Sequence, residues 1–136
     1  MATTAERVES GSAQTQAAPR SVVALLAVRD VQRSIDFYVK LGFELGKEPL
    51  KNDEGVATFA WMHHGQAAQI MLSRTGRTLN PGNQDVIFYL YVTDMPTYRE
   101  QLVARGVEVG EVKYPFWSPG GEFRVDDPDG WTWQVT

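Results

Sequence analysis

The stretch "AVRDVQRSIDFYVKLGFELG", residues Ala27 to Gly46, decides the fold because the chain repeats its plan further on. The segment "YVTDMPTYREQLVARGVEVG", Tyr91 to Gly110, aligns with it without a gap, at a constant offset of 64 residues. Each copy consists of a hydrophobic run, an aspartate, a helical stretch, a glycine and an alternating run. The identity between the copies is thin, but a repeat of this kind predicts two similar modules.

Each repeat predicts one helix. Asp30 and Asp94 are suited to be N-caps, because their carboxylates can accept from free backbone N–H groups at the positive end of a helix. Gly42 and Gly106 are suited to end the helices, because glycine takes the left-handed conformation that often follows the last turn. Between these limits, apolar residues recur at helical spacing. They are Val31, Ile35, Tyr38 and Leu41 in the first copy, and Met95, Tyr98 and Leu102 in the second.

Short strand patterns precede and follow each helix, and they predict an α+β fold with two βαβββ modules. In the first copy the strands expected after the helix are "FELGKEPL" (43–50), "ATFAWM" (57–62) and "AAQIMLS" (67–73), with a turn at "HHGQ" (63–66). In the second they are "VEVGEV" (107–112), "GEFRV" (121–125) and "WTWQV" (131–135), with a turn at "DPDG" (127–130). We expect modules at about residues 21–74 and 85–136, a linker at 73–84, and a disordered lead-in at 1–20.

Period-2 alternation separates the faces of three strands. One face is apolar and suits packing beneath helices: Val86, Phe88, Leu90 and Val92; Ala68, Ile70 and Leu72; Trp131, Trp133 and Val135. The other face is mixed, with phenol and amide groups among apolar side chains: Ile87, Tyr89 and Tyr91; Ala67, Gln69, Met71 and Ser73; Thr132, Gln134 and Thr136. A largely apolar surface with a few polar groups is the usual composition of a small-molecule pocket.

Composition narrows the classes of function. The 136 residues suffice for one compact domain, and the net charge of −4 argues against nucleic acid or an anionic membrane as a partner. No apolar run approaches the roughly 20 residues of a membrane span. The absence of cysteine excludes disulfides and thiolate chemistry and fits a reducing compartment, so we expect a cytoplasmic protein.

The repeats, together with "GGEFRVDDPDGWTWQV" at the C-terminal end, resemble the glyoxalase, bleomycin-resistance and dioxygenase superfamily, also called vicinal oxygen chelate proteins. The likeness covers Ser21 to Thr136, and "LLAVRDVQRSIDFY" and "AQIML" favour the bleomycin-resistance-like branch. The resemblance implies two βαβββ modules whose sheets form an open cup, often in a homodimer.

The same resemblance implies four positions in the cup where metal-using members place their ligands. These positions correspond to Val23, Met71, Ile87 and Gln134. Three of the four are apolar, and a divalent ion needs several carboxylate, imidazole or carbonyl ligands that converge on it. We therefore expect no metal, no other cofactor and no metal-dependent isomerase or dioxygenase chemistry of the usual kind. Gln134 is the one inherited position that can still donate or accept a hydrogen bond.

Several aromatic side chains are candidate ligand contacts, each with a structural alternative. Tyr89 and Tyr91 suit stacking or hydrogen bonding to a ligand, but a dimer contact or a neighbouring strand would also account for them. Trp61 is expected in phase with Gln69 and Met71, either lining the cup or in the core.

The segment "KYPFWSPGGEF" (113–123) is too irregular for a strand, and its Phe116 and Trp117 suit the rim of a pocket. A loop pinned to the core by its aromatic residues is the alternative. The only histidines, His63 and His64, are adjacent and predicted in or beside a turn, so we expect them not to converge on a metal.

These residues favour a metal-independent protein that binds a small aromatic or antibiotic-like molecule in the cup, with a homodimer as the expected assembly. The ligand-binding residues of this hypothesis are Val23, Trp61, Met71, Ile87, Tyr89, Tyr91, Phe116, Trp117 and Gln134; no catalytic residue is assigned. The alternative is a vicinal-oxygen-chelate enzyme, a lyase, isomerase or dioxygenase-like protein with a non-standard or absent metal site. It would need an isolated acid on the cup face, and the sequence shows none that is convincing. A scaffold without ligand is the third hypothesis.

Overall fold

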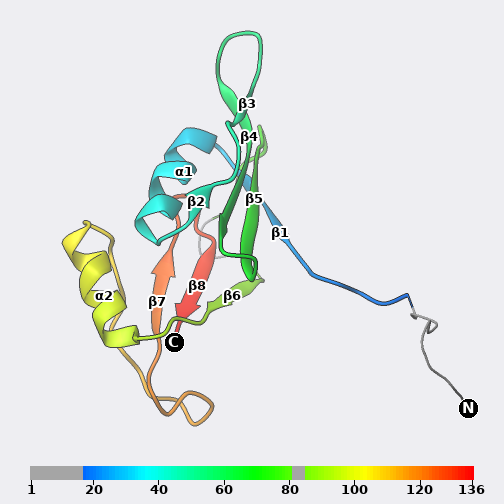
Figure 1. The fold of residues 1–136 in the computed structure, drawn as a ribbon. Coiled ribbons are helices and arrows are strands. Elements are labelled where there is room, and N and C mark those ends of the chain that lie inside the picture. The colour runs from blue at the N-terminus through cyan, green and yellow to red at the C-terminus, as the bar shows by residue number, and fades with distance from the viewer. Residues whose placement is uncertain (1–16, 81–84) are drawn as a thin grey trace, which may run out of the picture.

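The computed structural model describes residues 17–80 and 85–136. Most of the expected lead-in, residues 1–16, lies outside the described part. The first module contains β1 (Ala24–Val28), α1 (Val31–Lys40), β2 (Glu44–Leu45), β3 (Leu50–Lys51), β4 (Ala57–His64) and β5 (Ala68–Arg74) (Figure 1). The second contains β6 (Ile87–Leu90), α2 (Met95–Ala104), β7 (Phe123–Asp126) and β8 (Thr132–Val135).

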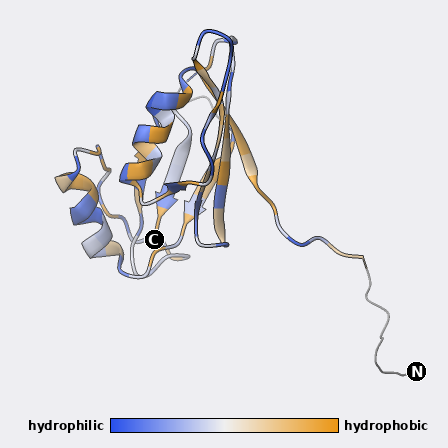
Figure 2. Cartoon of the chain, turned by 45° about the horizontal axis from the view of Figure 1, so that its top comes forward, coloured by the Kyte–Doolittle hydropathy of each residue, from blue (hydrophilic) through white to orange (hydrophobic). Residues whose placement is uncertain are grey.

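Both predicted helices are confirmed, with the limits that the repeats indicate. The carboxylates of Asp30 and Asp94 each accept from the backbone N–H three residues later, at 3.1 and 3.2 Å. Each helix is followed by a glycine with positive φ, 104° at Gly42 and 82° at Gly106. Hydrophobic and hydrophilic residues are interleaved along α1 and the neighbouring strands, as expected for elements with one buried side (Figure 2).

The strands form two sheets that repeat one arrangement. The first sheet has the order β1-β5-β4-β2, with β3 paired to β4, and the second has the order β6-β8-β7. In each module the strand before the helix runs parallel to the last strand, β1 beside β5 and β6 beside β8. This confirms the α+β fold with two related modules.

One predicted strand is absent from the structure, and another is reduced to two short strands. Residues 107–112 form no strand; their link to β7 is a hydrogen bond from Gly110 N–H to the Arg124 carbonyl at 2.8 Å. The Gly110 carbonyl instead accepts from the Arg99 guanidinium, at 3.1 Å from Nε and 2.7 Å from Nη2. A side chain of α2 thus replaces a strand partner. The segment 43–50 contributes only the short strands β2 and β3.

The turn predicted at residues 63–66 is displaced towards the C-terminus. His63 and His64 are the last residues of β4, where they pair with Gln69 and Ala68 of β5. The turn occupies residues 65–67 and uses Gly65, whose φ is 62°. The expected linker likewise begins later than 73, because β5 continues to Arg74.

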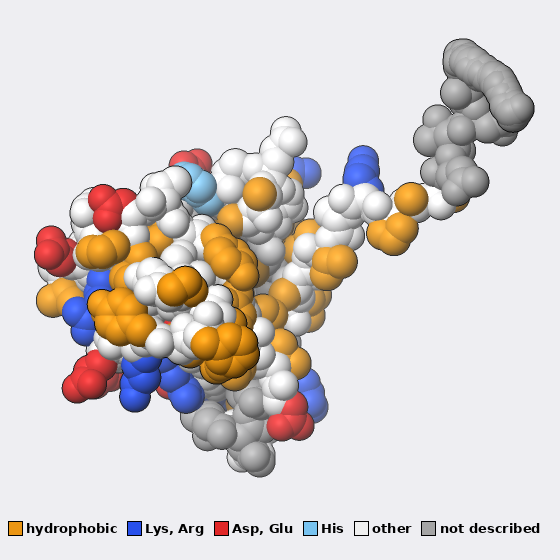
Figure 3. Space-filling view, turned by 90° about the horizontal axis from the view of Figure 1, so that it is seen from below, with side chains coloured by type: hydrophobic (Ala, Val, Ile, Leu, Met, Phe, Trp, Pro, Cys, Tyr) orange, Lys and Arg blue, Asp and Glu red, His pale blue; other side chains and the backbone are white. Residues whose placement is uncertain are grey.

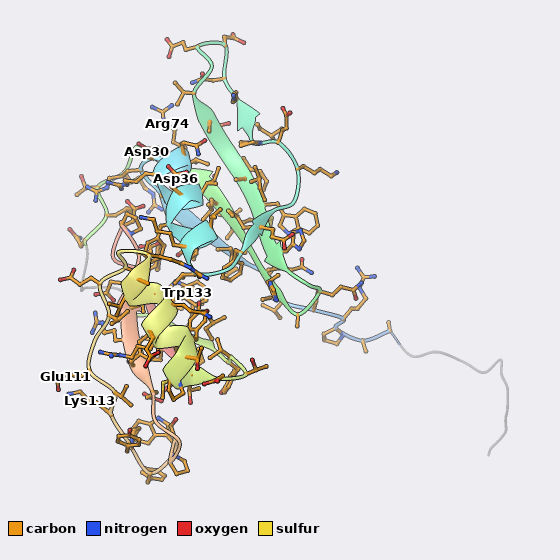
Figure 4. All side chains as sticks on the ribbon, turned by 60° about the vertical axis from the view of Figure 1, so that its left-hand side comes forward. Asp30, Asp36, Arg74, Glu111, Lys113 and Trp133 are labelled. Atoms are coloured by element: carbon orange, nitrogen blue, oxygen red, sulfur yellow. The ribbon has the colours of Figure 1, made fainter. Side chains whose placement is uncertain are left out.

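One hydrophobic core joins the two modules. Trp133 of β8 is 4% exposed, and its ring lies 5.8 Å from that of Tyr38 on α1 and 4.9 Å from that of Phe88 on β6. Its indole N–H donates to the Tyr38 hydroxyl at 3.1 Å. Trp131 donates from its indole to the Ala27 carbonyl at 2.9 Å. The assignment of both tryptophans to the helix-packed layer is confirmed, and Figure 4 shows Trp133 inside the molecule near the junction of the modules.

The turn after β7 is part of this junction. Asp127 is buried and accepts from the Tyr38 hydroxyl at 2.7 Å and from the backbone N–H groups of Asp129 and Trp131 at 2.9 and 2.8 Å. Burial raises the pKa of the Asp127 carboxyl, although these hydrogen bonds oppose the shift. Burial and the nearby Asp127 carboxylate raise the pKa of the Tyr38 phenol well above its ordinary value.

Asp129 binds the start of the first module to the same turn. Its side chain is fully buried, and its Oδ1 lies 3.0 Å from Nε of Arg29 and 3.3 Å from Nη2 of Arg33. The predicted turn at 127–130 is therefore also a polar link between segments about 100 residues apart in sequence.

Candidate functional site

A cavity of about 390 Å³ lies on the first sheet. It brings together three of the predicted site residues, Val23, Trp61 and Met71, and adds Gln69. Trp61 of β4 pairs directly with Met71 of β5, which confirms the predicted phase of these strands. We call this space the first-sheet cavity.

The Trp61 side chain is held in place by a close backbone approach. A Cβ atom at Gly46 would lie 2.7 Å from Cε3 of the Trp61 ring, so only glycine fits at this position without a shift. The Gly46 N–H also donates to the Trp61 carbonyl at 2.8 Å. The tryptophan ring is therefore packed against the connection between β2 and β3, and it lines the cavity from there.

A second space, also of about 390 Å³, lies between the two sheets, and we call it the inter-sheet groove. Ala24, Gln69 and Ile70 line it from the first sheet, and Tyr89 and Tyr91 are among the residues that line it from the second module. The Tyr89 and Tyr91 rings are stacked, with centroids 6.2 Å apart. Gln69 borders both this groove and the first-sheet cavity.

The remaining sheet positions of the predicted site lie on the opposite side of the second sheet from Trp133, which we call the second-sheet face. Tyr89 of β6 pairs with Gln134 of β8, and Gln134 pairs with Arg124 of β7. Ile87 is 54% exposed and Tyr89 is 42% exposed. Arg124 forms an ion pair with Asp126 at 2.9 Å and donates to the Thr132 hydroxyl at 3.2 Å.

Glu122 is an acid on the second-sheet face that sequence reasoning missed. It precedes Arg124 by two residues, so alternation places both side chains on the same face. The residue is only 7% exposed, its Oε2 accepts from the Tyr89 hydroxyl at 3.4 Å, and its Oε1 is buried without a hydrogen-bond partner among the described residues. Its phase with Arg124 and Gln134 was readable from the sequence, but its burial depends on the neighbouring β6.

The aromatic hairpin is the loop that joins Lys113 to Glu122, two residues paired by reciprocal backbone hydrogen bonds of 2.8 Å. Within the loop, the Ser118 hydroxyl lies 2.9 Å from the hydroxyl of Thr136, the residue that follows β8. Its tip exposes Phe116 by 91% and Trp117 by 61%. The hairpin projects at the bottom of Figure 1, and hydrophobic side chains gather on the face seen from below in Figure 3.

The four positions where metal-using members of the family place their ligands do not offer a ligand set for a divalent ion here. Val23 and Met71 line the first-sheet cavity, whereas Ile87 and Gln134 lie on the second sheet. The amide of Gln134 is the only hard donor among these four side chains. Within residues 17–80 and 85–136, no group of three or more His, Asp or Glu side chains is placed to hold a metal.

The two histidines point to different surroundings. The His63 ring lies 5.6 Å from that of Trp61, whereas His64 lines a separate cavity of about 300 Å³ with Tyr98. Their adjacent positions near the end of β4 account for this divergence, since successive strand residues face opposite ways.

The family model of the glyoxalase/bleomycin resistance protein/dioxygenase superfamily matches residues 20–135. The chain therefore belongs to this superfamily, as the repeats indicated. No curated protein sequence matches the chain. None of the helices in the described part of the chain is long and apolar enough to cross a membrane.

Solved structures with the same fold include proteins that bind antibiotics. A bleomycin-binding protein from bleomycin-producing Streptomyces verticillus, complexed with copper(II)-bleomycin, is 25% identical, with a TM-score of 0.66 over 89% of this chain and 98% of that one. An antibiotic binding protein, TnmS3, from Streptomyces sp. CB03234 is 24% identical, with a TM-score of 0.69 over 90% and 98%. A bleomycin-binding protein complexed with bleomycin is 18% identical, with a TM-score of 0.68 over 86% and 97%. The similarity to the Streptomyces verticillus protein supports the bleomycin-resistance-like branch, and the other two show the same fold.

Proposed function

We propose that this protein binds and sequesters a small aromatic or antibiotic-like molecule without a protein-bound metal. The observation that carries this proposal is the composition of the first-sheet cavity, where Val23 and Met71 occupy two inherited metal positions beside the Trp61 ring. Lys47 and Glu48 also line the cavity, but most of its lining is apolar or aromatic. Such a surface gains affinity from burial and stacking rather than from metal coordination. Gln69 adds an amide at its edge.

The solved structures support the class of ligand. Proteins whose structures contain bleomycin or copper(II)-bleomycin share this fold. The exposed aromatic side chains of the second module, above all Tyr91, Phe116 and Trp117, supply further surface against which a planar ring can stack. A binder that sequesters its ligand needs affinity and no turnover.

The proposal includes a homodimer in which each site is completed by a second copy. Within one chain, Val23, Trp61 and Met71 belong to the first-sheet cavity, while Ile87, Tyr89 and Gln134 belong to the second-sheet face. The strands β1 and β6 each stand at the end of the strand order of their sheet in the described residues. Sedimentation equilibrium should therefore give twice the mass of the chain, and a monomer that binds its ligand would remove this part of the proposal.

The enzyme alternative has one observation in its favour, the buried Glu122 beside the Tyr89 hydroxyl. A carboxylate in such a place is a candidate general base. Turnover distinguishes the two functions, because an enzyme converts its ligand and a sequestering protein returns it unchanged.

The test is a thermal-shift screen of aromatic antibiotics, with bleomycin among them, on protein treated with a chelator. We expect at least one compound to raise the melting temperature, since a ligand that binds only the folded state stabilises it. Mass spectrometry of the mixture should recover that compound intact. A panel without any stabilising compound, or stabilisation that requires an added divalent metal, would contradict the proposal.

A further inference from the structure

Glu122 is a buried carboxylate whose hydrogen bonds leave it largely unsatisfied. It is 7% exposed, and among the described residues its side chain has one hydrogen bond, the 3.4 Å contact of Oε2 with the Tyr89 hydroxyl. A hydrogen bond of that length is weak, and Oε1 has no partner within residues 17–80 and 85–136. Because a buried charge is costly unless it is paired, the folded chain alone does not account for a carboxylate here.

The cations nearest in register do not neutralise Glu122. Lys113 lies directly opposite across the base of the aromatic hairpin, but it is exposed, and no ion pair joins the two side chains. Figure 4 shows Lys113 and Glu111 at the outer edge of the loop that leads into the hairpin. Arg124, two residues along β7, is paired with Asp126.

Asp129 shows what a satisfied buried acid looks like in the same module. It also has one oxygen without a partner, but its other oxygen is bound by the guanidinium groups of Arg29 and Arg33. Glu122 has no guanidinium or ammonium partner of this kind within the described ranges.

Tyr89 connects Glu122 with the inter-sheet groove. Its ring lines the groove, and its hydroxyl reaches Glu122. A ligand that stacks on the Tyr89 and Tyr91 rings therefore brings its substituents close to the carboxylate. Rotation of the Tyr89 side chain would break only one long hydrogen bond, the one to Oε2 of Glu122.

We infer that Glu122 is a recognition residue that selects aromatic ligands with a protonated amine. The ammonium group donates to the Glu122 carboxylate, and the aromatic part stacks on Tyr89 and Tyr91. This assignment rests on the proposed function and narrows its ligand class to cationic aromatic molecules. The net charge of −4 acts in the same direction, because it favours the approach of a cation.

The experiment compares naphthylmethylamine, a cation at neutral pH, with the same isomer of naphthylmethanol, a neutral probe of nearly the same shape. Isothermal titration should show that the unmodified protein binds the amine about tenfold more tightly, since a hydrogen bond to a charged group is worth that much. In the Glu122→Gln variant this preference should disappear, while the affinity for naphthylmethanol stays unchanged.

Two further variants separate this role from general effects of charge and folding. Glu111→Gln removes an exposed acid from the neighbouring loop, and it should leave the preference for the amine intact. Tyr89→Phe keeps the carboxylate but removes the hydroxyl that donates to it, so the amine should still be preferred. Circular dichroism should show Glu122→Gln folded, because the fold does not depend on a carboxylate with one weak partner.

Equal affinity of the unmodified protein for both probes would overturn the inference and leave the binding of aromatic ligands in place. A preference that survives in Glu122→Gln, or a Glu122→Gln protein that does not fold, would overturn it as well. If neither probe binds, the assignment fails, and the antibiotic screen alone then decides the proposed function.

Discussion

The two ends of β7 carry buried carboxylates in opposite circumstances. Asp127, after the strand, accepts from the Tyr38 hydroxyl and from two backbone N–H groups. Glu122, before the strand, accepts from a single hydroxyl at 3.4 Å among the residues that the structure describes, and its other oxygen has no partner there. The difference separates an acid that holds the modules together from one that the fold leaves available. Burial by itself does not distinguish these roles, but the count of hydrogen-bond partners does.

The largest expected effect on stability is at Asp127, which follows β7. Asp127→Ala removes the acceptor of three buried or half-buried donors, so the free energy of unfolding should fall by about 3 kcal/mol or more. Urea denaturation measures the change. Asp53→Ala, which removes an exposed acid, is the matched control and should stay within about 0.5 kcal/mol of the unmodified protein. Equal effects of the two variants would remove the structural role of Asp127.

Tyr38→Phe should have the next largest effect. It deletes the hydroxyl that donates to Asp127 and accepts from the Trp133 indole, while the ring still fills the core. We expect a loss of about 1 to 2 kcal/mol in the free energy of unfolding. A double-mutant cycle with Asp127→Ala should show coupling between the two residues. Strict additivity would mean that the hydrogen bond contributes nothing.

The pH dependence of stability tests Asp127 as well, with a smaller expected effect. Burial raises the pKa of Asp127, so the folded state holds its proton more strongly than the unfolded state does. A group of this kind contributes stability below its unfolded pKa, and that contribution is lost as the pH rises through the folded pKa. The stability of the unmodified protein relative to Asp127→Asn should therefore fall as the pH is raised from about 4 towards neutral. Urea denaturation across this range checks the sign, and a relative stability that increases with pH would contradict it.

The smallest expected effect on stability is at Glu122, which precedes β7. Glu122→Gln neutralises a buried charge that has one weak partner, so the free energy of unfolding should stay within about 1 kcal/mol of the original or rise slightly. Thermal and urea denaturation measure it. A loss as large as that of Asp127→Ala would mean that both carboxylates stabilise the fold, which would contradict the difference proposed here.

The sequence predicted the features of the fold that depend on local periodicity. The two helices, their aspartate caps and their glycine ends follow from residues within a few positions of one another. The assignment of Trp133 to the core follows from simple alternation along one strand. The strand expected at 107–112 failed because the Arg99 side chain, from α2, binds the Gly110 carbonyl. No local sequence pattern predicts that a helix side chain will bind a backbone carbonyl in place of a neighbouring strand.

The candidate site was harder to predict because its surroundings are tertiary. The sequence placed Trp61 in phase with Gln69 and Met71, and the structure shows that Trp61 pairs directly with Met71. The sequence did not show that Asp127 binds Tyr38, 89 residues away, or that the Tyr89 hydroxyl donates to Glu122. The turn at 127–130 was interpretable as a turn, but its buried carboxylates became visible only with α1 beside it.

The central claim is that this chain binds an aromatic ligand without a metal and without converting it. The most direct measurement is calorimetric titration of chelator-treated protein with the best compound of the antibiotic screen, followed by mass spectrometry of the recovered ligand. We predict saturable binding, an affinity that added divalent metal does not change, and a ligand of unaltered mass. Binding that depends on added metal, or a ligand recovered as a product, would contradict the claim.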